Sequence, residues 1–282
     1  MTLTQIFARF RWRISVTLFI VLVEAVLFVL FPLFIGYAIN GVLEKSYSGL
    51  IYLGCLSLLT LITGTARRFY DSRVYAGIYQ ELGVETFERN QTAETSKLSA
   101  RINMLQELVE FFENSFPQLV NRVIGFVGIL ILLFSFSLNI FLACLVVTVV
   151  TVLVFGFTAE KTMRFNTKYN DTLEKQVSVL EQGRSLLVKG YVKNLMRWNI
   201  RLSDLETVNY SIVFLAMVGL MIYAVVESVG MGTMNYGAIF SVVMYVFEFM
   251  NNTFELPVYY QEWLRLKDIS ERLQDNQERI DR

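Results

Sequence analysis

Residues 140–159 read IFLACLVVTVVTVLVFGFTA, an uninterrupted apolar run without a charged side chain. A helix needs about 20 such residues to cross the roughly 30 Å hydrocarbon core of a membrane. Beyond Ala159, charged residues recur beside apolar ones at helical spacing, and no cluster of Gly or Pro interrupts them. We therefore expect one helix from Ile140 to about Lys189, which would be about 75 Å long at 1.5 Å per residue. Much of this helix would extend beyond the bilayer.

Five further apolar runs accompany this one. The six runs are Ile14–Ile39, Leu50–Ala66, Leu119–Phe136, Ile140–Ala159, Tyr210–Val226 and Tyr236–Leu256. Lipid offers no partners for backbone hydrogen bonds, so runs of this length cross a membrane as helices. Apolar residues make up 54% of the chain and aromatic residues 14%, as expected for a polytopic helical protein. The sequence predicts an all-α membrane protein with six transmembrane helices.

The positive charges are distributed unevenly across the predicted membrane. If the N-terminus is cytoplasmic, only Lys45 of the 25 Lys and Arg residues falls outside. This bias obeys the positive-inside rule, so we expect both termini to be cytoplasmic. The outer links are short, whereas the polar stretches at about 67–120 and 160–209 would form two helical extensions in the cytoplasm. The compact outer links and the absence of a cleavable signal favour a bacterial inner membrane.

The remaining segments lie at the two ends of the chain. We expect residues 1–13 to form an interfacial elbow helix, because Leu3, Ile6, Phe7 and Phe10 share one helical face that can lie in the headgroup plane. A frayed cytoplasmic tail is the alternative. Residues 14–257 would form the six-span domain, and residues 258–282 a cytoplasmic helical tail.

The composition excludes several kinds of chemistry. The chain has no histidine, so the commonest metal ligand and the usual proton shuttle at neutral pH are missing. Cys55 and Cys144 both lie inside apolar runs, where a thiol packs like a small apolar residue. We expect no disulfide, no metal site and no cofactor. The formal net charge is zero and gives no reason to expect a nucleic-acid partner.

Short motifs occur at regular points around the six runs. They are Phe31-Pro32-Leu33 with Gly36 and Asn40, Arg67-Arg68 with Tyr70, Leu82 to Phe87 with Arg89, Ser99-Ala100-Arg101, Phe116-Pro117-Gln118-Leu119, Glu181 with Val188-Lys189, and Met231-Gly232-Thr233-Met234 with Gly237. In order and spacing they resemble the six-helix transmembrane domain of ABC-type exporters. The resemblance implies an exporter-type fold in a domain-swapped homodimer, because six spans form only half of the transport pathway.

The nucleotide-binding domain of that family has no counterpart in this sequence. No G-x-x-x-x-G-K-[ST] motif is present, and no aspartate follows four apolar residues. We therefore expect the chain not to be an enzyme, and any ATPase activity would come from a partner. The segment from Phe87 to Arg101 is also shorter than the family's first coupling turn. Within it, Gln91–Lys97 lacks the Pro-aromatic pair and the Thr-Gly that contribute to ATPase docking.

Charged side chains inside spans are costly, which makes them candidates for function. Glu24 and Glu248 lie midway along the first and sixth runs. Carboxylates in apolar surroundings can take up a proton near neutral pH, so these two residues are candidates for binding a proton or a cationic substrate. The alternative is a structural hydrogen bond to a neighbouring helix.

Other candidates lie beside these carboxylates or near the ends of spans. Phe28 and Tyr245 offer aromatic faces to an amphipathic cation, although most such residues simply pack. Glu227 and Glu255 lie near span ends, where water reaches them. We expect Arg122, at the start of the third run, to extend to the membrane surface or to pair with Glu113 or another carboxylate of the extensions.

The second cytoplasmic turn contains the candidates for coupling to a partner. Arg184, Lys189, Lys193 and Asn194 occur there, and a solvated helix face is the alternative interpretation.

Three functions remain open. The first is the transmembrane subunit of an ABC-type transporter that works by alternating access, with the ATPase on a separate polypeptide. The second is a proton-coupled carrier of the same fold without an ATPase, and the third is a non-transporting membrane partner subunit. An amphiphilic or cationic substrate is a guess based on two carboxylates among aromatic residues.

Overall fold

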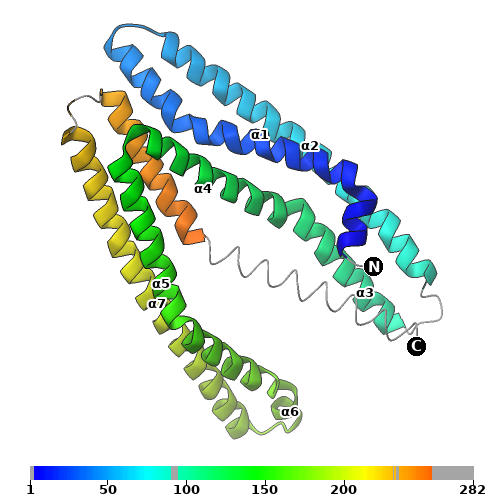
Figure 1. The fold of residues 1–282 in the computed structure, drawn as a ribbon. Coiled ribbons are helices and arrows are strands. Elements are labelled where there is room, and N and C mark those ends of the chain that lie inside the picture. The colour runs from blue at the N-terminus through cyan, green and yellow to red at the C-terminus, as the bar shows by residue number, and fades with distance from the viewer. Residues whose placement is uncertain (1–2, 90–94, 231, 233–234, 256–282) are drawn as a thin grey trace. The chain divides into compact units, whose positions relative to one another are not determined.

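The computed structural model describes residues 3–89, 95–230, 232 and 235–255, and all regular structure within them is helical (Figure 1). The helices are α1 (Leu3–Leu43), α2 (Ser48–Arg89), α3 (Thr95–Glu110), the π-helix η1 (Phe111–Ser115), α4 (Phe116–Phe136), α5 (Leu138–Leu173), α6 (Gln176–Glu181) and α7 (Ser185–Gly230). A further helix covers residues 236–255. The predicted tail at 258–282 and much of the turn expected over Gln91–Lys97 lie outside the described residues.

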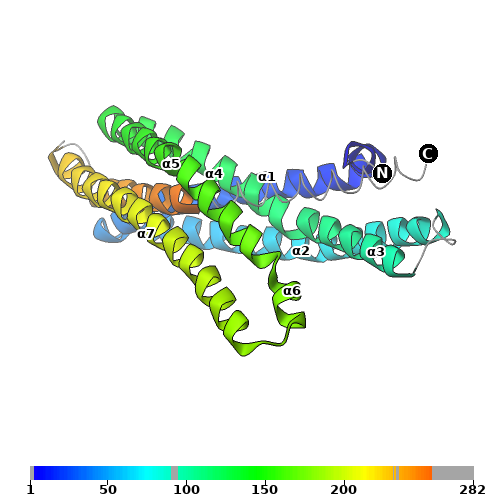
Figure 2. The same cartoon turned by 90° about the horizontal axis from the view of Figure 1, so that it is seen from below.

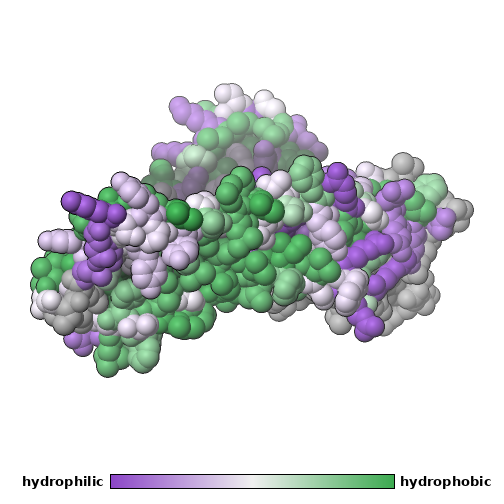
Figure 3. Space-filling view, turned by 90° about the horizontal axis from the view of Figure 1, so that it is seen from above, coloured by the Kyte–Doolittle hydropathy of each residue, from purple (hydrophilic) through white to green (hydrophobic). Residues whose placement is uncertain are grey.

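Five helical stretches are long and apolar enough to cross a membrane. They are Ala8–Leu43, Ser48–Glu88, Leu105–Phe136, Leu138–Glu181 and Ser185–Gly230. Each contains one of the first five predicted runs, and the sixth run is helical over residues 236–255. Only 11–28% of the most apolar window in the five stretches is buried inside the protein, which suits lipid-facing surfaces. Figure 3 shows a continuous hydrophobic surface across the middle of the body nearest the viewer.

Three of the helices extend beyond their apolar runs, as the sequence predicts. The α2 helix continues past Ala66 to Arg89, α5 passes Ala159 to reach Leu173, and α7 begins at Ser185, well ahead of Tyr210. The cytoplasmic location of these extensions stays a prediction.

The described helices group into two compact units. Unit 1 comprises Met1–Phe136 and Ser228–Arg282, and unit 2 comprises Ser137–Glu227.

Unit 2 is an antiparallel hairpin of α5 and α7, with α6 at its tip (Figures 1 and 2). The Asn209 amide donates a hydrogen bond of 2.8 Å to Oγ1 of Thr158, and the Phe165 and Trp198 rings lie 6.1 Å apart. The prediction of one helix from Ile140 to about Lys189 is wrong, because α5 ends at Leu173 and the chain reverses. Gly183 adopts φ +61° in this reversal, a conformation that a glycine reaches without steric cost.

In unit 1, the N-terminal part of α1 packs onto the polar end of α2, α3 and η1. A buried apolar cluster there includes Phe10, Ile14, Leu82, Leu108 and Phe112. The α1 helix bends at Phe10, whose φ and ψ are −104° and 17°. The sequence assigned Phe10 to a face in the headgroup plane, but its side chain is 5% exposed and packs inside the protein. Hydrophobic burial therefore turns the Phe10 side chain into this cluster rather than toward the headgroup plane.

Candidate functional site

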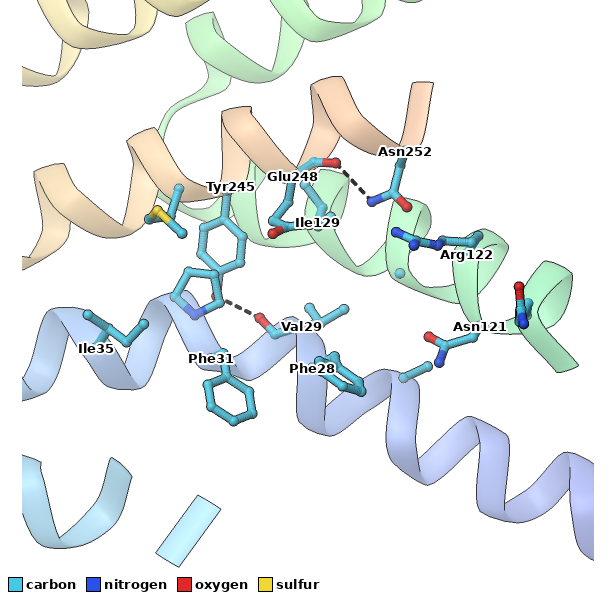
Figure 4. A pocket seen from close by; sticks show the side chains of 15 residues that line it. Phe28, Val29, Phe31, Ile35, Asn121, Arg122, Ile129, Tyr245, Glu248 and Asn252 are labelled. Carbon is cyan, nitrogen blue, oxygen red and sulfur yellow. Dashed lines mark hydrogen bonds between the residues drawn. The ribbon is translucent and has the colours of Figure 1, made fainter. Parts of the chain in front are cut away.

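The candidate site is a pocket of about 580 Å³ within unit 1 (Figure 4). It lies between α1, α4 and the 236–255 helix. The lining residues are Ala25, Phe28, Val29, Phe31, Pro32 and Ile35 from α1, Gln118, Asn121, Arg122, Gly125 and Ile129 from α4, and Met244, Tyr245, Glu248 and Asn252 from the 236–255 helix. Three of the predicted site residues, Phe28, Tyr245 and Glu248, therefore meet at one cavity.

Pro32 shapes the α1 wall of this pocket. Proline has no N–H, so the α-helical hydrogen bond to the Phe28 carbonyl cannot form at this point. Two hydroxyl groups of the 236–255 helix bond to α1 carbonyls beside it. Ser241 donates to the Pro32 carbonyl at 2.7 Å, and Tyr245 donates to the Val29 carbonyl at 2.9 Å. Because the Tyr245 side chain is fully buried, its main contribution is to hold these two helices together.

Two glycines bring the same helices into backbone contact beyond the pocket. A Cβ placed on Gly36 would lie 2.5 Å from the Gly237 carbonyl oxygen, and a Cβ on Gly237 would collide with the Gly36 carbonyl. The Gly237 N–H also donates to Oδ1 of Asn40 at 2.8 Å. Small residues allow close helix crossings of this kind. The end of α1 after Pro32 is therefore tied to the start of the 236–255 helix.

The polar groups of the pocket gather at one end. Figure 4 shows Asn121, Arg122 and Asn252 at that end, with Ile35 and Phe31 toward the other. Nε of Arg122 lies 3.0 Å from a carboxylate oxygen of Glu255, and both side chains are about 40% exposed (42% and 39%). Glu113 was one of the alternatives expected for Arg122, and the ion-pair partner that the structure shows is Glu255 instead. Because Arg122 faces its carboxylate partner Glu255, its charge is already partly balanced.

Glu248 is the remaining charged residue of the pocket lining. Its backbone carbonyl accepts a hydrogen bond of 2.9 Å from the Asn252 amide. Within the described part of the chain, its half-buried carboxylate forms no ion pair or side-chain hydrogen bond. A carboxylate in such a position attracts a cation or a proton, and the aromatic face of Phe28 lines the same cavity. The pocket thus combines one unbalanced negative charge, several amides and an apolar wall.

Glu24 is not an isolated carboxylate, contrary to the expectation from sequence. One of its oxygens lies 2.6 Å from Nε of Arg67, and the two side chains are 10% and 17% exposed. Arg67 also lies 3.3 Å from Asp71, which accepts a hydrogen bond of 2.6 Å from Thr17. This buried network joins α1 to α2, and Glu24 is absent from the pocket lining. The structural alternative for Glu24 is therefore favoured, because its carboxylate already contacts Arg67 of the neighbouring helix.

The other predicted site residues lie in unit 2 and do not contribute to the pocket. Glu227 accepts a hydrogen bond of 2.6 Å from Asn139, close to the end of the hairpin opposite α6. The coupling candidates Arg184, Lys189, Lys193 and Asn194 are exposed near the α6–α7 turn. Asn194 also borders a second pocket of about 370 Å³ beneath that turn. A role in coupling stays a prediction for these residues.

Sequence reasoning missed the amide lining of the main pocket. Gln118, Asn121 and Asn252 line it, although none was a candidate. A polar amide within an apolar run is a usable signal, since an unsatisfied polar group in hydrocarbon is unfavourable.

The fold and pocket define a polytopic helical membrane protein with a partly polar cavity among its helices. Residues 3–237 match the family described as the ABC transporter transmembrane region, and the chain belongs to this family. The recognition made from the motifs is thereby confirmed, and the protein is a transmembrane subunit of the ABC transporter type. The match includes the α1 and α4 walls of the pocket and ends before Tyr245 and Glu248. Comparison with curated proteins found no match.

Proposed function

We propose that this protein moves an amphiphilic or cationic substrate across the bacterial inner membrane by alternating access. It would act as a domain-swapped homodimer with both termini in the cytoplasm. We assign ATP hydrolysis to a separate polypeptide and no enzymatic activity to residues 1–282, which contain no G-x-x-x-x-G-K-[ST] motif. Membership of the transporter family supports the general class.

The observation that best supports a substrate site is the pocket containing Glu248. Its volume of about 580 Å³ lies in the range of small-molecule sites. A cation with an apolar body would place its charge near Glu248 and its apolar part against Phe28 and Phe31. Desolvation strengthens a charge interaction of this kind, and the amides nearby can orient a substrate hydrogen-bonding group.

The exposed turn beside α6 would be the contact point for the ATPase. Arg184, Lys189 and Lys193 present positive charge there, and Asn194 lies on the same stretch of α7. In this proposal, closure of the ATPase pair would move the α5–α7 hairpin. The motion would change the side of the membrane to which the pocket opens.

A proton-coupled carrier without an ATPase is the second candidate function. The unpaired carboxylate of Glu248 favours it, because such a group can bind and release a proton. The pairing of Glu24 with Arg67 removes the second carboxylate on which this interpretation relied. Proton coupling would therefore depend on Glu248 alone.

One purification and one transport assay test these functions together. The protein would be purified from its native membranes in mild detergent, and co-purifying proteins would be identified by mass spectrometry. A stoichiometric ABC-type ATPase, with ATP-dependent transport of ethidium in proteoliposomes, supports the first function. A homodimer that transports ethidium only under a proton gradient would favour the second. A protein that copurifies with no ATPase and transports ethidium under neither condition contradicts both.

A further inference from the structure

Asn252 holds a free amide oxygen at the polar end of the pocket in unit 1. It lies one helical turn after Glu248, on the same face of the 236–255 helix, and is 5% exposed. Its Nδ2 donates the 2.9 Å hydrogen bond to the Glu248 carbonyl, and because a carbonyl only accepts, this bond identifies the nitrogen of the amide. Oδ1 lies on the other side (Figure 4), and no donor among the described residues bonds to it. A buried acceptor in this condition is unfavourable until a donor reaches it.

The α1 wall of the pocket contains a second acceptor without its usual donor. Pro32 lacks the N–H that would bond to the Phe28 carbonyl, and both residues line the cavity. Two neighbouring hydroxyl groups bond to the Val29 and Pro32 carbonyls instead. Backbone carbonyls freed at breaks in membrane helices coordinate cations in transporters. With the carboxylate of Glu248 and the amide oxygen of Asn252, three acceptor groups therefore line one cavity.

A glycine on α4 keeps the space beside the free amide oxygen open. Two contacts show that α4 and the 236–255 helix run antiparallel here, Arg122 to Glu255 at 3.0 Å and Phe126 to Phe249 at 5.4 Å between ring centres. In this register Gly125 lies level with Asn252, and both line the pocket. Beyond the neighbouring backbone of its own helix, a Cβ on Gly125 would meet no described atom within 4 Å. A ligand can therefore reach the Asn252 oxygen.

The groups around the charge indicate which kind of cation fits. Quaternary ammonium ions have no N–H to donate and bind in cages of aromatic rings. Here amide side chains occupy the polar end, and Phe31 lies toward the other end, so Phe28 alone does not form a cage (Figure 4). The Arg122 charge faces Glu255, which leaves the charge of Glu248 as the surplus. A protonated primary amine carries three N–H donors, which match the three acceptor groups.

We propose that the pocket binds its substrate through a primary ammonium group and that Asn252 determines this specificity. The ammonium donates to Glu248, to Oδ1 of Asn252 and to the Phe28 carbonyl. The apolar body of the substrate extends toward Phe31 and Ile35. This inference rests on the proposed transport of a cation, and it narrows the substrate class to amphiphilic primary amines. Quaternary cations of similar size interact through charge alone and bind more weakly.

A methylation series tests the role of the N–H groups. The purified protein in detergent would be titrated calorimetrically with phenylbutylamine and with its N-methyl, dimethyl and trimethyl derivatives, which keep the charge and the apolar body. Each methyl group removes one donor, so we expect the affinity to fall along the series by about tenfold or more in total. Equal affinities would overturn the ammonium specificity and leave the cation site in place. If none of these amines binds, the proposed cation-binding function fails as well.

Asn252→Leu tests the proposed acceptor, because leucine resembles asparagine in shape and lacks the oxygen. We expect phenylbutylamine to bind about fivefold or more weakly in this variant, while the trimethyl derivative keeps its affinity. Asn251→Leu is the matched control, since Asn251 is adjacent and absent from the pocket lining. It should leave both affinities unchanged. An Asn252→Leu protein that loses affinity for both ligands equally, or for neither, contradicts the role given to Asn252.

Two further variants separate charge and position from hydrogen bonding. Glu248→Gln should weaken both ligands, since it removes the attraction that they share. Unchanged affinities in this variant would remove the charged site on which the proposed function depends. Gly125→Leu fills the open space and should abolish the binding of both ligands. If phenylbutylamine binds to Gly125→Leu as it does to the unmodified protein, the ligand lies elsewhere and the ammonium site is wrong.

Discussion

The carboxylate of Glu24 on α1 lies 2.6 Å from Nε of Arg67 on α2, inside the helix pair rather than in the pocket. Asp71 and Thr17 extend this contact into a buried polar network. A buried ion pair with good hydrogen bonds balances most of its desolvation cost, whereas the loss of one partner leaves the other charge uncompensated. This relationship makes Glu24 and Arg67 a structural pair.

Loss of the Arg67 charge should destabilise the protein. Arg67→Gln leaves Glu24 and Asp71 without their cation, and we expect the free energy of unfolding to fall by about 3 kcal/mol. Thermal and denaturant unfolding in detergent would measure the change. Arg68→Gln is the matched control, since Arg68 is exposed and adjacent in sequence. The double variant Glu24→Gln with Arg67→Gln should recover part of the loss, and a double variant less stable than Arg67→Gln would contradict the pairing.

Neutralising Glu248 should reduce the affinity of the pocket for a cation. We expect Glu248→Gln to weaken ethidium binding about tenfold or more, because a charge-assisted contact contributes about 1.5–3 kcal/mol. Glu248→Asp, which keeps the charge, should retain more of the affinity. Fluorescence titration with ethidium measures both. Glu44→Gln is the control, since Glu44 lies outside the pocket lining. Unchanged binding in Glu248→Gln would remove Glu248 from the site.

Adding a methyl group at the helix crossing should separate α1 from the 236–255 helix. Gly237→Ala places a Cβ against the Gly36 carbonyl, and we expect a loss of about 1–3 kcal/mol from this overpacking. Gly54→Ala in α2 is the control, because beyond the neighbouring backbone of its own helix no described atom lies within 4 Å of the added Cβ. Replacing that helical glycine should be neutral or mildly stabilising. Similar melting temperatures for the two variants would argue against the close crossing.

The Tyr245 hydroxyl should contribute to stability more than to substrate binding. Tyr245→Phe removes the donor to the Val29 carbonyl next to Pro32, and we expect a loss of about 1 kcal/mol. Ethidium affinity should change less than in Glu248→Gln. Parallel unfolding and binding measurements separate the two effects. A large loss of affinity at unchanged stability would instead identify Tyr245 as a ligand-contacting residue.

The long apolar runs made the helical membrane architecture predictable. Lipid offers no hydrogen-bond partners, so the backbone N–H and C=O groups of residues 140–159 must bond to one another within the segment. An α-helix is the structure that allows this. The motifs around Phe31-Pro32-Leu33 and Arg67-Arg68 also identified the family correctly. The second cytoplasmic turn was predicted near Glu181 from the motifs, but the earlier end of α5 at Leu173 was not, since charged and apolar residues continue at helical spacing beyond it.

The candidate site was predictable only in part. Charge inside an apolar run marked Glu24 and Glu248 equally, because both are carboxylates of similar depth in their spans. Their environments differ through contacts between segments far apart in the chain. Glu24 meets Arg67 of α2, whereas Glu248 faces a cavity that α1 and α4 complete.

The sequence by itself determined the class of protein, the position of its apolar helical segments and its family, because hydrophobic length and local motifs act within single segments. Only the tertiary structure showed that Glu24 is paired with Arg67, whereas Glu248 lines the pocket without an ion-pair partner among the described residues. It also brought Lys168 together with Arg197 and Arg201 around Trp198. Electrostatic interactions depend on distance in space, and that distance is set by helix packing rather than by separation along the chain.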